Sequence, residues 1–250
     1  MLPLFKSHYS IGKSILTLET SSSKEGSDSI FQIAKDENLS EIILLEESIG
    51  GFMEAYLNSQ EVGIPIRFGL IFYVVSKVTK DHKEDKKTAS KVAIFAKNSS
   101  GYKDLVKIYT LANDRLGFGR VSFEELGELW TEDLYLTIPF YDSFIHNNIF
   151  THKECIPDFS FCEPIFFIEN NDLPFDQYIK AGIEKYLKYS KGTIQPAKTI
   201  LYRNKKDFEA WQTFRCMCSR SFGKPSLFRP ELKGCCSDLF CYEAFLEESK

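Results

Sequence analysis

Hydrophobic and polar positions change along the chain in a pattern that predicts alternating strands and helices. Seven short, nearly unbroken apolar runs are typical of strands that are buried on both faces. These runs are Leu2–Phe5, Ile42–Leu45, Ile66–Val75, Val92–Ala96, Leu134–Ile138, Ile165–Ile168 and Thr199–Tyr202. Between most of them, apolar residues recur at the spacing of an amphipathic helix, and a last helix is predicted from about Asp238 to Glu248.

The segment Lys91–Asn113 displays this alternation most clearly. Val92–Ala96 predicts a buried parallel strand, and Asn98–Gly101 then supplies a turn and a side-chain oxygen that can cap a helix. The following residues place apolar side chains at helical spacing, namely Tyr102, Leu105, Val106, Tyr109 and Ala112. We interpret the segment as one strand–helix unit of an α/β fold.

Strands that alternate with helices are typical of a parallel α/β sheet, and at 250 residues a barrel is favoured over an open sheet. We predict a single domain over residues 1–250, with the barrel in roughly residues 1–220 and a C-terminal extension in residues 221–250. The mixed-charge segment Lys77–Lys91 predicts a solvated loop, and Gly223–Gly234 is irregular in pattern.

Composition narrows the function classes. The 43% hydrophobic content is enough for a substantial core, and the net charge of −4 argues against a broad basic surface for nucleic acid. No apolar run approaches the ~20 residues that span a bilayer, and the first residues do not resemble a signal peptide. Seven irregularly spaced cysteines are not typical of a secreted disulfide framework. We therefore expect a reduced, cytoplasmic protein with no membrane partner.

Active residues of parallel barrels lie at the carboxyl ends of strands, so the polar residues that follow the predicted strands are candidates. His8, Glu46, Glu47 and Asp142 could form the remains of a hard-metal or phosphate site, since imidazole and carboxylate together bind Zn, Mn or Mg. The alternative is that they are ordinary polar residues at strand ends. We favour the alternative because the chain contains no HxH, HxxxH or DxH motif.

Other motifs give little support to catalysis. Cys216-x-Cys218 and Cys235-Cys236 could suggest a zinc knuckle, but their spacing differs from paired CxxC motifs and no histidine lies in that segment. The glycines do not form GxGxxG or GxxxxGK[ST], and GxSxG is also missing. We expect the cysteines to be ordinary buried or surface thiols.

Four stretches together resemble a known family. The string AKNSSGYKDLVKIYTLAN resembles the segment after a central strand in the polymerase-and-histidinol-phosphatase (PHP) domain that opens the alpha subunit of bacterial DNA polymerase III, the family C polymerases. PLFKSHYSIGKSIL is similar to the opening histidine-rich motif of that domain, and GGFMEAYLNSQEVGIPIRFGLIFYVV to the helix and strand after its second motif. TILYRNKKDFEAWQTFRCM is similar to its last strand and following helix. The resemblance covers nearly the whole chain and implies a distorted seven-stranded (β/α)7 barrel.

Active members of the family hold a cluster of metal ions and hydrolyse phosphoesters, which in some polymerases provides proofreading. Carried over residue by residue, the ligand positions fall on Leu4 and Lys6, Leu45 and Glu46, Ile71, and Thr199 and Leu201. Leucine and isoleucine cannot bind a metal, and Lys6 would place a cation where a cation should bind. The resemblance therefore implies a degenerate site with no metal, no cofactor and no catalytic residue, whose former pocket has packed shut.

Two main hypotheses follow. In the first, the chain is a structural module of a bacterial or phage replicative polymerase, whose partners are the polymerase catalytic region and a separate proofreading exonuclease. DNA is then contacted only through the assembly, and Gly223–Gly234 with the final helix are candidate contacts to the rest of the polymerase. In the second, His8, Glu46, Glu47 and Asp142 still bind one metal and hydrolyse a phosphoester. A third reading, direct nucleic-acid binding, is disfavoured by the acidic balance.

Overall fold

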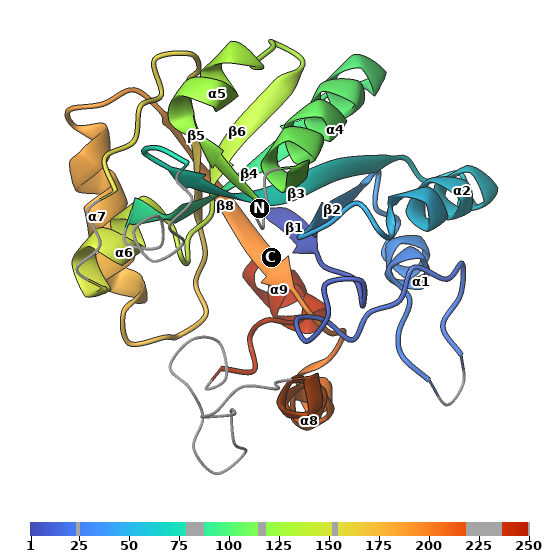
Figure 1. The fold of residues 1–250 in the computed structure, drawn as a ribbon. Coiled ribbons are helices and arrows are strands. Elements are labelled where there is room, and N and C mark those ends of the chain that lie inside the picture. Colours follow the sequence, from blue (N-terminus) through green and yellow to red (C-terminus); the bar gives the residue numbers. More distant parts are fainter. Residues whose placement is uncertain (24–25, 79–87, 115–118, 152–154, 219–236, 250) are drawn as a thin grey trace. The chain divides into compact units, whose positions relative to one another are not determined.

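The computed structural model describes residues 1–23, 26–78, 88–114, 119–151, 155–218 and 237–249 (Figure 1). Its contacts divide the chain into two compact units, which we describe separately. Unit 1 comprises Met1–Arg67, Glu169–Asp176 and Ala197–Lys250, and unit 2 comprises Phe68–Ile168 and Gln177–Pro196. Both units contain helices and strands, so the α/β class predicted from the sequence is confirmed.

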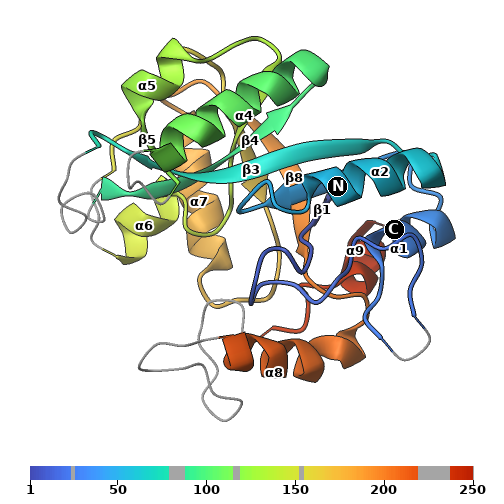
Figure 2. The ribbon, with the colours of Figure 1, turned by 45° about the vertical axis from the view of Figure 1, so that its right-hand side comes forward.

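Unit 1 is built on parallel strands. Its elements are β1 (Leu2–Phe5), α1 (Ile30–Asp36), β2 (Ile42–Glu46), α2 (Phe52–Val62), the second half of β8 (Thr193–Ile200), a 3₁₀ turn η1 (Lys205–Asp207), α8 (Phe208–Cys218) and α9 (Tyr242–Ser249). β1 lies between β2 and β8 and is parallel to both, so that Leu4 lies opposite Ile43 on one side and Thr199 on the other. Helices α1 and α2 lie side by side in both views (Figures 1 and 2).

Unit 2 contains strands of both directions. Its elements are most of β3 (Ile66–Val75), β4 (Ser90–Ala96), α4 (Ser99–Asp114), β5 (Arg120–Ser122), α5 (Phe123–Glu128), β6 (Leu134–Ile138), α6 (Phe144–Phe150), β7 (Ile165–Ile168), α7 (Asp176–Leu187) and the first half of β8. β4 is antiparallel to its neighbours β3 and β6, whereas β6–β7, β7–β8 and β3–β5 are parallel pairs.

The antiparallel direction of β4 corrects the prediction of a parallel strand at Val92–Ala96. Parallel neighbours need a crossover long enough for a helix, whereas antiparallel neighbours can be joined by a loop. The connection from Val75 to Ser90 is the charge-rich segment, whose pattern predicts a loop rather than a helix. Residues 79–87 of that segment lie outside the described residues. The missing amphipathic pattern between the two strands was therefore a sign that they are antiparallel.

All seven predicted strands are present, and β5 is an additional strand of three residues. The largest difference is β8, which begins six residues before the predicted Thr199 and contains Pro196. Proline cannot donate a ladder hydrogen bond, which is why the pattern did not predict a strand there. In the structure Pro196 is the last residue paired with β7, and Ala197 is the first residue paired with β1.

The helix predictions hold with changed boundaries. Asn98 caps α4 as expected, because its Oδ1 accepts from the backbone N–H groups of Ser100 and Gly101 at 2.9 and 3.0 Å. The last helix begins at Tyr242 rather than Asp238. Its Tyr242 and Phe245 are buried, and the Tyr242 ring stacks on Phe5 with centroids 5.8 Å apart. The predicted final helix is therefore part of the core of unit 1.

The single-domain prediction for residues 1–250 stays a prediction. The described part of the predicted extension, residues 237–249, groups with β1 and β2 in unit 1 rather than by itself. The segment Gly223–Gly234 lies outside the described residues.

Candidate functional site

The carboxyl ends of β1 and β2 meet at one edge of unit 1, because the two strands are parallel neighbours. β1 ends at Phe5 and is followed by Lys6 and Ser7, which are 9% and 0% exposed. β2 ends at Glu46, whose side chain is fully buried. These three polar residues lie at the strand ends that the sequence analysis considered for a residual site.

Glu46 is held by donors from the loop that follows β1. The backbone N–H of Ser7 donates to Oε1 at 2.7 Å, and the Ser10 hydroxyl donates to Oε2. Burial raises the pKa of the Glu46 carboxyl, while the hydrogen bonds from Ser10 and Ser7 and the charge of Lys6 oppose that rise. Both carboxylate oxygens therefore fasten the loop after β1 to the end of β2.

His8 lies in the same loop without contacting Glu46 through a hydrogen bond in the described part of the chain. Its backbone N–H donates to the Leu16 carbonyl at 2.8 Å, and its ring packs on Tyr9 with centroids 4.5 Å apart. Its Nδ1 atom is buried and has no hydrogen-bond partner among the described residues. His8 is thus a half-buried ring with one unsatisfied nitrogen.

The remaining candidates of a residual site, Glu47 and Asp142, have different surroundings. Glu47 is exposed, and Asp142 belongs to unit 2, where it forms an ion pair with Lys91 at 3.1 Å. The described residues contain no group of three or more His, Cys, Asp or Glu side chains placed to hold a metal ion.

The apolar residues at the other positions taken over from the resemblance are part of the packing. Leu4, Leu45 and Leu201 are 2%, 4% and 8% exposed and belong to the core of unit 1. Ile71 lies on β3 in unit 2, where it is half-buried opposite Ala93. Thr199, the remaining position, donates hydrogen bonds to a second buried carboxylate, Glu169.

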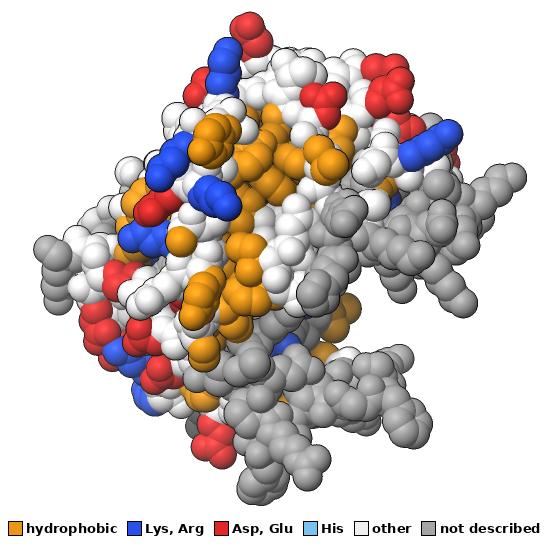
Figure 3. Space-filling model, turned by 90° about the vertical axis from the view of Figure 1, so that its left-hand side faces the viewer, with side chains coloured by type: hydrophobic (Ala, Val, Ile, Leu, Met, Phe, Trp, Pro, Cys, Tyr) orange, Lys and Arg blue, Asp and Glu red, His pale blue; other side chains and the backbone are white. Residues whose placement is uncertain are grey.

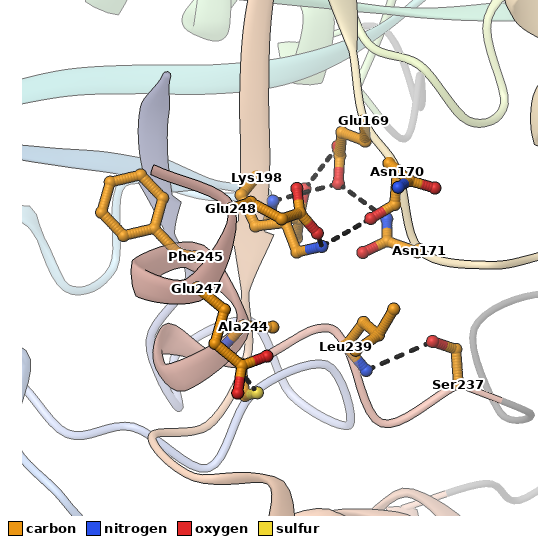
Figure 4. A network of polar contacts seen from close by, with 12 residues as sticks. Glu169, Asn170, Asn171, Lys198, Ser237, Leu239, Ala244, Phe245, Glu247 and Glu248 are labelled. Carbon is orange, nitrogen blue, oxygen red and sulfur yellow. Dashed lines mark hydrogen bonds and ion pairs between the residues drawn. The ribbon is translucent and has the colours of Figure 1, made fainter. Parts of the chain in front are cut away.

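Glu169 is a buried carboxylate that the sequence analysis missed. It follows β7 directly and accepts from the Thr199 backbone N–H at 3.0 Å and from the Thr199 hydroxyl at 2.8 Å (Figure 4). Asn171 Nδ2 donates to the same carboxylate at 3.1 Å. The pKa of the Glu169 carboxyl is raised, because the effect of burial outweighs three opposing effects. These are the hydrogen bonds from Thr199 and Asn171 and the positive charge of Lys198. The strand-end rule that selected Glu46 would also have found Glu169.

Lys198 connects this network to the last helix. Its side chain is fully buried, and its Nζ donates to the Asn170 carbonyl and to Glu248 of α9 (Figure 4). Sequence patterns do not indicate this contact, since a lysine inside a strand is usually assigned to the solvent face. The cation joins the turn after β7, the strand β8 and helix α9.

The cysteines form no metal centre in the described part of the chain. Cys216 and Cys218 lie on α8 and form no disulfide, and Cys235 and Cys236 of the disfavoured zinc knuckle lie outside the described residues. Burial raises the pKa of Cys162 to about 12 and that of Cys241 to about 11, so neither thiol is an activated nucleophile.

The two buried carboxylates, Glu46 and Glu169, hold the loops that donate hydrogen bonds to them. The oxygens of both carboxylates therefore already accept from protein donors. Within the described residues, none of the helices has the length and apolar character that crossing a bilayer requires. A scan against protein-family models finds no match for the chain, and a search of curated proteins finds none either.

Proposed function

We propose that this chain is a metal-free, PHP-like structural module of a replicative DNA polymerase of the polymerase III alpha type. It supports replication by packing on the polymerase catalytic region or on a proofreading exonuclease, in the cytoplasm of a bacterium or a phage-infected cell. It contacts DNA through that assembly and is not catalytic by itself.

The observation that carries the proposal is the state of Glu46. It is the one carboxylate among the seven positions at which the resemblance places metal ligands, namely Leu4, Lys6, Leu45, Glu46, Ile71, Thr199 and Leu201. Its oxygens accept from Ser7 and Ser10, and Lys6 supplies positive charge beside it. A divalent cation at Glu46 would have to displace these donors and tolerate the lysine.

The fold supports the same proposal. The seven predicted strands are all present, and β3 and β8 each continue from one unit into the other. We infer that they form the distorted seven-stranded (β/α)7 barrel of PHP domains, in which β4 is reversed and β5 is added beside β3. The buried leucines at positions 4, 45 and 201 fill the place where an active member binds its metals.

Metal content tests the first part of the proposal. Elemental analysis of the purified chain, before and after incubation with zinc and manganese, should give less than about one tenth of an equivalent. The melting temperature should not rise with either metal, because a ligand that binds only the native state must stabilise it. Near-stoichiometric metal would overturn the proposal.

Association tests the second part. The chain should co-elute in gel filtration with the catalytic region of a family C polymerase whose own N-terminal domain has been deleted. The intact polymerase is the control, since its own domain already occupies that place. A pull-down with a purified proofreading exonuclease tests the other partner. Failure to associate with either protein would contradict the scaffold role, even if the chain holds no metal.

One observation favours the alternative, a residual metal-dependent phosphoesterase or 3'-5' exonuclease. The buried Nδ1 of His8 has no partner among the described residues, and imidazole nitrogen is a common metal ligand. This alternative predicts a chelator-sensitive hydrolysis of phosphoesters that is lost in Glu46→Ala and in His8→Ala. The scaffold proposal predicts no such activity in the wild-type chain.

A further inference from the structure

Helix α2 in unit 1 has two apolar faces, and the core covers one of them. Phe52, Ala55 and Ser59 are buried against unit 1. Met53, Tyr56 and Leu57 are 69%, 51% and 58% exposed. A helix that packs on one side normally presents polar residues on the other.

The three exposed side chains form one surface. Their positions differ by three, four and one residues, so Met53 lies beside both Tyr56 and Leu57 on the helix. Clustered exposed apolar groups mark interaction sites more often than single ones do. Methionine adapts its shape to different partners, and tyrosine is enriched in protein interfaces. We call Met53, Tyr56 and Leu57 the α2 surface.

The charged residues of helix α2 itself are all of one sign. From Ser40 to Pro65 the chain has five glutamates and no lysine, arginine or histidine. Two of them, Glu54 and Glu61, are on α2, and Glu61 lies in its last turn, where no basic residue is present. The carboxyl end of a helix dipole is itself negative, so this turn lacks the cation that usually stabilises it.

The nearest cations in sequence lie outside α2. Arg67 forms an ion pair with Glu41 at 3.0 Å, whereas Lys35 of α1 donates to the Thr20 carbonyl at 3.1 Å, a neutral acceptor that leaves the lysine charge in place. Glu54 accepts from the Tyr9 hydroxyl at 2.7 Å, a neutral donor that leaves the carboxylate charge in place. The α2 surface is therefore an apolar strip with two glutamates of the same helix, Glu54 and Glu61, along one side.

Unit 2 has a second apolar surface, and the charged residues near it are of both signs. Figure 3 shows hydrophobic side chains gathered on the face where α5, α6 and α7 lie in Figure 1. Exposed apolar residues of α6 and α7 include Ile149, Phe150 and Tyr178, at 42%, 41% and 66%. Exposed charges on α7 are of both signs, with Lys180 and Lys185 beside Glu184. Such a rim does not select the charge of a partner.

We propose that the α2 surface docks an amphipathic helix of a partner protein, with apolar side chains at i, i+3 or i+4, and i+7 and with lysine or arginine along one flank. The apolar side chains would cover Met53, Tyr56 and Leu57, and the flanking cations would face Glu54 and Glu61. A second copy of this chain is disfavoured as the occupant, because it would bring the same negative charge to the interface. The inference does not depend on the polymerase assignment.

The test is a display selection against the full chain. The library consists of 20-residue helices with fixed apolar positions, in which every other position varies among Lys, Glu, Gln and Ala. We expect the selected helices to be enriched in lysine on the flank that faces Glu54 and Glu61. Binding of the synthesised helices, followed by fluorescence anisotropy, should weaken at least about tenfold in Met53→Ser and in Leu57→Ser. Glu61→Lys should weaken lysine-flanked helices and strengthen glutamate-flanked ones.

Matched controls come from α8, also in unit 1. Met217 is 76% exposed and Glu209 is exposed, so Met217→Ser and Glu209→Lys make the same chemical changes away from α2. All variants alter exposed side chains, and an unchanged melting temperature checks that they fold. Equal effects of the α2 and α8 variants, or selected helices without a lysine bias, would overturn the proposal. A homodimer that Leu57→Ser dissociates would also overturn it, since the occupant would then be a second copy.

Discussion

At the scale of single residues, Glu46 is a carboxyl group that the fold removes from water and surrounds with donors. Burial raises its pKa despite the opposing hydrogen bonds from Ser10 and Ser7. A raised folded-state pKa gives stability that is complete below the unfolded pKa and is lost as the pH rises through the folded pKa. Glu46→Gln cannot ionise and does not lose this stability. The free energy of unfolding of the wild type should therefore fall relative to that of Glu46→Gln as the pH rises above the unfolded pKa of about 4.

Thermal unfolding of both proteins at a series of pH values measures this difference. Glu61→Gln on α2 removes a glutamate charge from an exposed position and serves as the control. A difference between Glu46→Gln and the wild type that does not change with pH would contradict the assignment of Glu46 as a buried, perturbed carboxyl group.

Sequence patterns located Glu46 but missed Glu169 and Lys198. Glu46 was found because it ends a clear apolar strand and coincides with a ligand position of the resemblance. Glu169 also follows a predicted strand, but it matches no ligand position and was passed over. Burial of Lys198 depends on Glu248, 50 residues away in the chain, and local patterns contain no information about such a pair.

At the scale of elements, the ion pair between Lys198 and Glu248 fixes α9 to β8. The Lys198 side chain is 0% exposed and that of Glu248 is 28% exposed, so removal of Glu248 leaves a buried cation with less compensation. Glu248→Ala should lower the free energy of unfolding by about 1–3 kcal/mol, as measured by urea denaturation. Adding Lys198→Met should lower it by less than the sum of the two single effects.

The neighbouring pair of Glu247 and Lys205 provides the control. Its side chains are 54% and 32% exposed, and solvent screening leaves such exposed pairs with little effect on stability. If Glu247→Ala costs as much as Glu248→Ala, the burial of Lys198 has no energetic consequence and the interpretation fails.

Gly101 in the first turns of α4 is required by a close approach of the backbone. A Cβ atom there would lie 2.1 Å from the carbonyl oxygen of Asp133. Alanine normally stabilises a helix relative to glycine by about 1 kcal/mol, but at this position we expect Gly101→Ala to destabilise by about 1–3 kcal/mol. Ser100→Ala, at an exposed position of the same turn, is the control in thermal unfolding. A stabilised Gly101→Ala would show that the contact with Asp133 relaxes freely.

Elements were predicted well where residues close in sequence determine them, and poorly where neighbouring strands determine their direction or extent. The capping of α4 by Asn98 was predictable because donors and acceptor lie within three residues. The direction of β4 was not read correctly, although the loop before it held the information. The early start of β8 depends on its pairing with β7. The sequence pattern does not indicate this pairing, because the segment contains a proline.

At the scale of the whole molecule, neither compact unit is continuous in sequence. Unit 1 draws on three segments of the chain and unit 2 on two. The residues after 236 supply Tyr242 and Phe245 to the core of unit 1, so this part is not a dispensable extension. A chain ending at residue 218 should lose the protection of β1 and β2 amides in hydrogen exchange, because their packing partner is gone.

A second variant separates loss of packing from loss of chain length. Tyr242→Ala keeps every residue and removes the ring that stacks on Phe5, with an expected cost of about 3–5 kcal/mol. Protected β1 and β2 amides in both the shortened chain and Tyr242→Ala would restore the prediction of a separate C-terminal extension.

Strand β5 bears on the tendency of unit 2 to aggregate. Within the described residues it pairs with β3 on one side, and its other side offers backbone groups to which a further extended chain could be added. The strand is only three residues long, and the capping box of Ser122 and Glu125 turns the backbone into α5 at once. Segments that seed amyloid are about six or seven residues long. The early helix start therefore leaves too short a template for templated fibril growth at this edge.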